Sequence, residues 1–135
     1  MKNILFMLAI ITCILSFSCK EKKSERFKLR TGHVWTTDSL LANGVDASGP
    51  GELLELFKGD AKFEEDGTGT FGNYEGTWWF NTKETEINID TDEIPIVIIC
   101  DIVELTSSSL KITAVVPSLL NPLESNDIRM TFKAK

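Results

Sequence analysis

The chain has 135 residues, of which 42% are hydrophobic and 25% charged, and its formal net charge is −6. This length allows one folded domain but not two. Phosphate contacts need clustered lysines and arginines, and the negative charge of this chain opposes them, so we expect no nucleic-acid partner.

The first 18 residues have the pattern of a secretory signal peptide. Lys2 precedes an apolar run from Ile4 to Phe17, and the small residue Ser18 stands directly before Cys19. The run is too short and wrongly flanked for a transmembrane helix. We therefore predict export, with residues 1–18 removed.

A cysteine that follows a small residue and precedes the charged segment "KEKKSER" resembles the lipobox of bacterial lipoproteins, in the relaxed form found in Bacteroidetes. This resemblance implies that Cys19 is acylated, for example with palmitate, and becomes the new N-terminus. It also implies an outer-membrane lipoprotein in a Gram-negative cell envelope, facing the periplasm or the cell surface. The alternative is an ordinary signal peptide that leaves Cys19 as a free thiol.

Residues 19–30 are predicted to form a basic tether, and residues 31–135 the folded domain. Residues 20–30 contain six basic and two acidic side chains, whereas residues 31–135 contain seven basic and eighteen acidic ones. A basic segment beside an acyl anchor favours anionic lipid headgroups by about 1 kcal/mol per basic residue close to the surface. A linker that is basic only for solubility explains the composition equally well.

Apolar and polar residues alternate from residue 33 onward, which predicts β-strands. We predict eight strands, at residues 33–37, 60–65, 68–71, 75–81, 85–90, 94–106, 109–116 and 127–133. Asp66-Gly67 is a typical hairpin turn. Most of the connections are short and polar, which indicates that successive strands are antiparallel neighbours.

Residues 50–59 depart from this alternation and predict a short helix. Pro50 stands near the first helical position, and Gly59 stands where a C-cap glycine belongs. Leu53, Leu56 and Phe57 give the segment an apolar face. Because a helix of two turns does not fold alone in water, we expect it to pack against the sheet.

The predicted fold is all-β: an eight-stranded antiparallel up-and-down barrel with one short helix packed outside. Closure into a barrel removes the strand edges that promote aggregation. Eight strands leave an interior that either is filled by side chains or holds one small ligand. A two-sheet β-sandwich is the alternative fold.

Four motifs carry a resemblance to the small lipocalin-like, calycin-type lipoproteins of Bacteroidetes: "LRTGHVW", "KFEEDGTGTF", "YEGTWWF" and "ELTSSSLKIT". The similarity covers most of residues 29–133. It implies an eight-stranded barrel that is able to hold a small apolar molecule.

The chain offers few residues for catalysis, and we predict that it is not an enzyme. His33 is the only histidine and cannot form a Ser-His-Asp relay by itself. Cys100 is in phase with Ile98 and Ile102, which predicts a buried and inert thiol. The segment "NIDTDE" lacks the glycine and the final glutamate of a calcium loop. No catalytic, metal or cofactor residue is predicted.

The side chains expected inside the barrel are the candidate ligand site. These candidate ligand-lining residues are Trp35, Phe63, Trp78, Phe80, Ile112 and Met130. The leading hypothesis is a monomeric, membrane-anchored barrel that binds a small apolar or amphipathic ligand. The alternative is a protein-interaction or inhibitor module with a solid barrel that acts through its loops.

The connection between the last two strands is unusually apolar, because it holds Leu119, Leu120 and Leu123 between and beside Pro117 and Pro122. A turn folded over one barrel end is the favoured interpretation. A lid over a ligand mouth, or a partner-contacting loop, is the functional alternative.

Trp78 and Trp79 are adjacent in a predicted strand, so their side chains point to opposite faces. We predict that Trp78 points inward and Trp79 outward. Val97 and Ile99 are also expected on the outer face. Leaving such side chains exposed forgoes about 1.5 to 3 kcal/mol each, so the helix of residues 50–59 is expected to cover them.

Overall fold

The computed structural model describes residues 23–135. The predicted signal peptide, residues 1–18, and Cys19 lie outside the described residues. Within residues 23–135 no helix has the length and apolar character needed to cross a membrane.

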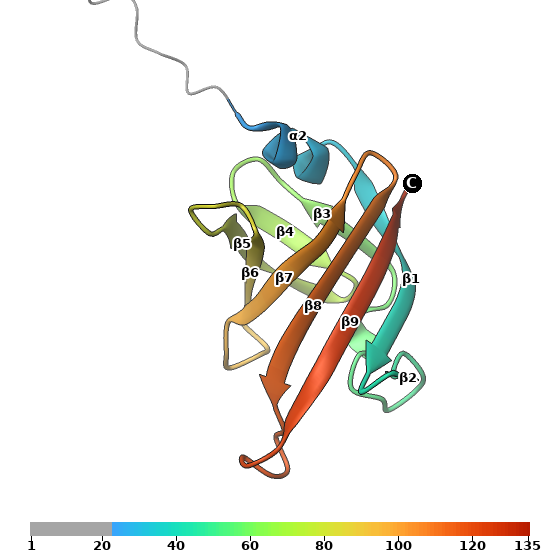
Figure 1. Ribbon diagram of the computed structural model, residues 1–135. Helices are drawn as coiled ribbons and strands as arrows, with labels where there is room; N and C mark the ends of the chain where they lie inside the picture. The colour runs from blue at the N-terminus through green and yellow to red at the C-terminus, as the bar shows by residue number, and fades with distance from the viewer. Residues whose placement is uncertain (1–22) are drawn as a thin grey trace, which may run out of the picture.

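An antiparallel sheet that closes on itself forms the body of the protein (Figure 1). Closure occurs where β9 pairs with β1, from Trp35 opposite Ala134 to Ala42 opposite Ile128. The eight barrel strands are β1 (Val34–Ala42), β3 (Asp60–Phe63), β4 (Thr68–Phe71), β5 (Tyr74–Phe80), β6 (Glu86–Thr91), β7 (Ile98–Leu105), β8 (Ser109–Pro117) and β9 (Ser125–Ala134). A short strand, β2 (Val45–Asp46), pairs only with the end of β1. The predicted eight-stranded antiparallel barrel is confirmed, and the two-sheet sandwich is not found.

The largest differences from the predicted strand boundaries are at the end of β1 and the start of β7. β1 continues to Ala42 because a register shift between Thr37 and Ser39 restores the inward phase for Leu40, which is buried. β7 begins at Ile98 rather than at residue 94, since residues 92–96 form turns and bends. The apolar residues among them therefore lie at the end of the barrel and are not part of a strand.

The segment predicted as a two-turn helix is shorter than expected. It contains one 3-10 turn, η1 (Glu55–Phe57). Leu54 and Phe57 are buried, and the Phe57 ring centroid lies 4.7 Å from that of Tyr74. The segment therefore packs at one end of the barrel, where it meets the start of β5.

The expected cover over the outer face of β5 and β7 is wrong. Trp79 is 45% exposed and Ile99 is 55% exposed. Trp79 and Ile99 both pair with Asn88 of the intervening strand, so they form one outward row. η1 does not cover this row because its buried side chains are directed at the barrel end.

A helix that the sequence analysis missed closes the other end of the barrel. α2 (Glu25–Thr31) starts at Ser24, whose Oγ accepts a hydrogen bond of 3.0 Å from the Phe27 N–H. The indole Nε1 of Trp35 donates to the Arg30 carbonyl oxygen at 3.0 Å. Residues 25–30, which were predicted to be tether, are therefore part of the folded domain (Figure 1).

The barrel core is a layer of tightly packed inward side chains. Trp78 is 4% exposed, which confirms that it points inward, opposite to Trp79. Aromatic rings fill the half of the core near α2: the Phe63 ring centroid lies 5.5 Å from that of Trp78, and the Phe27 ring centroid 5.6 Å.

Replacing Gly76 with alanine tests the close packing of the strands. A Cβ atom on Gly76 would lie 1.9 Å from the Asp90 carbonyl oxygen, so β5 and β6 would have to move apart. We expect Gly76→Ala to lower the free energy of unfolding by about 2 kcal/mol or more, measured by urea denaturation with tryptophan fluorescence. Gly49→Ala is the control, because its Cβ meets only Glu52 Cγ at 3.5 Å. Equal stability of the two variants would contradict the expectation.

Candidate functional site

An apolar pocket opens at the end of the barrel opposite α2, and we call it the mouth pocket. Its volume is about 240 Å³. Three chain segments form its rim: residues 53–57 around η1, residues 93–96 before β7, and residues 116–119 at the end of β8. Ile98, Ile128 and Met130 are the strand residues beneath it. Tyr74 and Glu93 are the lining residues that carry polar side-chain groups.

The predicted loop of leucines only partly belongs to this pocket. Leu119 lines it, whereas Leu120 and Leu123 do not. These two side chains are 97% and 96% exposed. The structure therefore separates one candidate lid residue from two surface leucines.

The six candidate ligand-lining residues do not surround one common cavity. Trp35, Phe63 and Trp78 pack together near α2, and Phe80 is only partly buried. Phe63, Ile112 and Met130 line an inner cavity of about 10 Å³, which is room for roughly one water molecule. Met130 also lines the mouth pocket. Alternation predicts which side chains point inward, but not how much space they leave. Here the large inward aromatic side chains fill that space.

Arg30 is the residue of the interior that sequence reasoning missed. Its side chain is fully buried, and its guanidinium carbon lies 3.2 Å from the centroid of the Phe63 ring. Burial lowers the pKa of Arg30 well below its ordinary value, and the nearby Cys100 partly opposes this decrease. The available signal was Ser24 as an N-cap before Glu25, but nothing in the composition marked Arg30 among the basic residues around it.

Cys100 lies in the same interior and is completely buried, as predicted. Burial raises the pKa of its thiol to about 12, an increase that the positive charge of Arg30 partly offsets. At neutral pH the side chain is therefore a neutral thiol rather than a nucleophilic thiolate.

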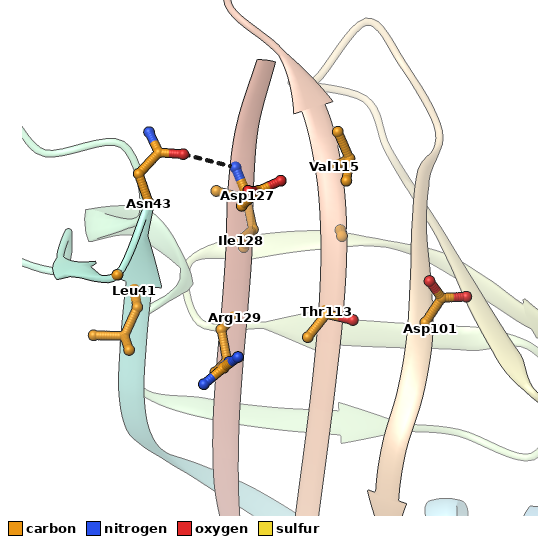
Figure 2. A pocket seen from close by; sticks show the side chains of 10 residues that line it. Leu41, Asn43, Asp101, Thr113, Val115, Asp127, Ile128 and Arg129 are labelled. Atoms are coloured by element: carbon orange, nitrogen blue, oxygen red, sulfur yellow. Dashed lines mark hydrogen bonds between the residues drawn. The ribbon is translucent and has the colours of Figure 1, made fainter.

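A second hollow lies on the outer surface, over the neighbouring strands β7, β8, β9 and β1 (Figure 2). Its volume is about 560 Å³, and its walls are mixed. The Asn43 side-chain oxygen accepts a hydrogen bond of 2.9 Å from the Asp127 backbone N–H. Asn43 has a φ of 52°, as the first residue of the Asn43-Gly44 turn after β1. These contacts shape the turn after β1.

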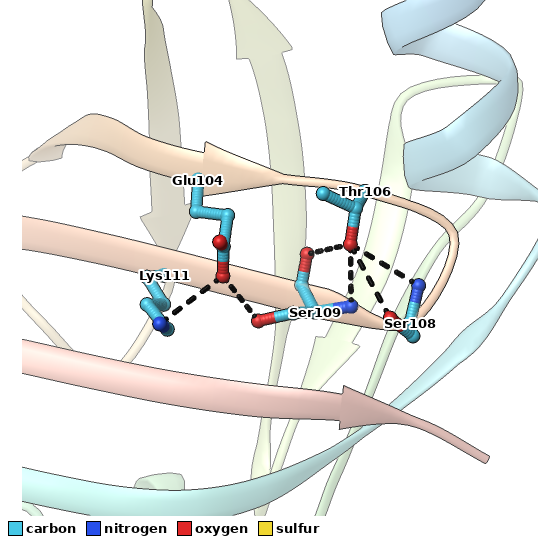
Figure 3. A network of polar contacts seen from close by, with 5 residues as sticks. All are labelled: Glu104, Thr106, Ser108, Ser109 and Lys111. Carbon is cyan, nitrogen blue, oxygen red and sulfur yellow. Dashed lines mark hydrogen bonds and ion pairs between the residues drawn. The ribbon is translucent and has the colours of Figure 1, made fainter.

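The turn between β7 and β8 carries the polar network of Figure 3. The Thr106 hydroxyl accepts hydrogen bonds from the backbone N–H groups of Ser108 and Ser109. Glu104 accepts from Ser109 Oγ at 2.6 Å and pairs with Lys111 at 3.2 Å. These hydrogen bonds lower the pKa of Glu104. Each of these groups stabilises the turn, so the network has a structural role.

The part of the chain that the structure describes contains no arrangement of side chains suited to metal binding or to histidine catalysis. Among residues 23–135, no group of three or more His, Cys, Asp or Glu side chains could hold a metal ion. The His33 ring packs edge-on against Trp35, with centroids 5.4 Å apart.

No family model matches the sequence, and no curated protein matches it. A solved structure that is similar is the complex of bovine odorant binding protein with a selenium-containing odorant. The similarity has a TM-score of 0.55 and covers 87% of this chain and 78% of that chain, at 11% sequence identity. It shows the class of fold: the protein is a lipocalin-like barrel.

The burial of Cys100 predicts a slow thiol reaction. In a chain of residues 20–135, which lacks Cys13 and Cys19, we expect iodoacetamide at pH 8 to alkylate Cys100 at least about a hundredfold more slowly in the native state than in urea. The reason is that a pKa of about 12 keeps the native thiol protonated. Mass spectrometry follows the reaction. Rapid complete alkylation of the native protein would show that Cys100 is accessible and ionised.

Proposed function

We propose that this protein is a membrane-anchored, lipocalin-like lipoprotein that binds a small apolar or amphipathic ligand at the mouth of its barrel. The observation that carries the proposal is the mouth pocket of about 240 Å³. Ligand pockets are typically concave and apolar, with a few polar groups that orient the ligand. Tyr74 and Glu93 are groups of that kind on an otherwise apolar wall.

The proposed activity is binding without catalysis, by a monomer and with no nucleic-acid partner. A solved structure of similar fold is, by its title, an odorant binding protein in complex with an odorant. Cys100 is held as a neutral, buried thiol, which suits a core residue better than a nucleophile.

Acylation of Cys19 would anchor the barrel to the outer membrane, facing the periplasm or the cell surface. α2, the first element of the described residues, lies at the end of the barrel opposite the end of β8 (Figure 1), and the end of β8 lines the mouth pocket. An anchor at that end would leave the mouth facing away from the membrane. The ligand would then be exchanged with the surrounding compartment rather than with the anchoring bilayer.

The anchor is tested by labelling cells with a palmitate analogue that carries an alkyne. We expect the wild-type protein to be labelled and to sediment with membranes, and Cys19→Ser to lose the label and become soluble. Cys100→Ser is the control and should keep both properties. Labelling of Cys19→Ser at the wild-type level would overturn the assignment.

Filling the mouth pocket tests the ligand site. Val116 lines the pocket, whereas the adjacent Val115 points outward and is 67% exposed. For alcohols and carboxylates of eight to sixteen carbons, the variant Val116→Trp should weaken binding by about tenfold or more, because the indole occupies the ligand's space. Isothermal titration calorimetry on the mature chain with Cys19→Ser measures this. Val115→Trp should bind as the parent does.

The absence of saturable heat with every one of these compounds would overturn the ligand-binding proposal. Unchanged binding in Val116→Trp would instead place the site elsewhere. The calorimetric experiment therefore distinguishes a wrong function from a wrong location.

A protein-interaction module is the second candidate function, and the exposed apolar side chains favour it. Trp79 and Ile99 form an uncovered outer row, and Leu120 and Leu123 are almost fully exposed. Large exposed apolar side chains that gather on one surface often mark contact sites. Since Leu120 and Leu123 do not line the mouth pocket, replacing both with serine separates the two functions: ligand binding should persist while contact with a partner is lost.

A further inference from the structure

Arg30 places a positive charge inside the barrel, at the end that α2 closes. The residue belongs to the last turn of α2, and its backbone carbonyl is held by the Trp35 indole. Its guanidinium lies over the face of Phe63, a core residue that is 1% exposed. The stacking partially stabilises the cation through the ring quadrupole. The Phe63 ring, however, offers no hydrogen-bond acceptor to the N–H groups that lie in the plane of the guanidinium.

The guanidinium has no acceptor within the described part of the chain. Its Nε, Nη1 and Nη2 atoms all lack a hydrogen-bond partner among residues 23–135, and no carboxylate there forms an ion pair with it. Arginine remains protonated in folded proteins. The side chain that shares its surroundings, Cys100, is a neutral thiol at neutral pH. The interior therefore holds an uncompensated charge together with unsatisfied donors, which is a costly arrangement in a protein core.

The mouth pocket is connected to Arg30 through side chains that line more than one cavity. Phe57 and Met130 line both the mouth pocket and the inner cavity of about 10 Å³. Phe63 lines the same inner cavity and carries Arg30 on its face. Phe57, Met130 and Phe63 thus form a series of contacts from the open end of the barrel to the buried charge. One of them, Phe57, is in η1, between Gly51 and Gly59, which have φ angles of 77° and 125°.

We propose that the ligand is an anionic amphiphile whose charged group, in the simplest case a carboxylate, pairs with Arg30 while its apolar chain extends to the mouth pocket. The inference rests on the proposed binding function and names the chemical class of its ligand. A carboxylate accepts two parallel hydrogen bonds from a guanidinium and supplies the missing counter-charge. Because the inner cavity holds no more than a water molecule, Phe57, Met130 and Phe63 must change rotamer as the chain enters.

A pair of compounds with matched chain length, decanoate and decanol, tests the inference on the mature chain with Cys19→Ser. We expect decanoate to bind at least about tenfold more tightly than decanol in calorimetric titrations. Arg30→Met keeps about the same volume and removes the charge, so it should weaken decanoate binding by about tenfold or more and abolish the difference. Arg30→Lys should keep part of the preference. Arg129→Met, which removes an outward arginine of the surface hollow, should keep all of it.

The stability of the unliganded variants separates a ligand-binding role of Arg30 from a purely structural one. If the charge waits for a ligand, Arg30→Met should unfold at the same or a higher urea concentration than the parent, because an unpaired buried charge has been removed. Decanoate should raise the urea midpoint of the parent and not that of Arg30→Met. A lower midpoint for Arg30→Met, with unchanged decanoate preference, would assign Arg30 to the core and overturn the inference.

Equal affinity of the parent for decanoate and decanol would overturn the anionic ligand and leave the binding function intact. Binding of neither compound would overturn both. If Arg30→Met fails to fold, the comparison of decanoate with decanol on the parent and on Arg30→Lys still tests the proposal. A parent that binds decanol and decanoate with equal affinity would contradict it.

Discussion

The pairing of β1 with β9 closes the sheet into a barrel, and the core and the two barrel ends follow from this closure. Trp35 lies opposite Ala61 of β3 and opposite Ala134 of β9, so the first strand joins the two edges of the sheet. Once the sheet is closed, alternate side chains of every strand point into one narrow space. Aromatic residues fill this space near α2, and the smaller and more flexible side chains near η1 leave a pocket. Closure thus creates two unlike barrel ends from one repeated pattern.

The two ends have different chemistry. The α2 end is sealed by Phe27 and Trp35, and it encloses the charge of Arg30. The opposite end is apolar and open, with Leu119 at its rim. The proposed ligand, with one charged group and one apolar chain, would match both ends.

The strands could be predicted from the sequence because a period of two is a local signal. The inward position of Trp78 and the burial of Cys100 followed from the same alternation, and both are confirmed. The prediction that a helix covers Trp79 was wrong, because it assumed that an apolar outer row must be buried. The local sequence pattern does not say which end or face of the barrel a loop will reach. η1 instead turns Leu54 and Phe57 toward the barrel end. The apolar residues 94–97 were read as strand for a related reason: composition does not distinguish a strand from the rim of a pocket.

The antiparallel strands, their inward faces and the class of fold could be inferred from the amino-acid sequence, because each depends on the order of neighbouring residues. The position of the open space and the burial of one particular charge depend on packing between segments that are distant in the chain. Of the six candidate lining residues, five are buried and Phe80 is partly buried. Their bulk divides the interior into a filled half and a pocket. Arg30 looked like one more basic residue of a tether. It became part of the interior because α2 folds back on Trp35, and the burial of a side chain is set by what packs over it rather than by its neighbours in the chain.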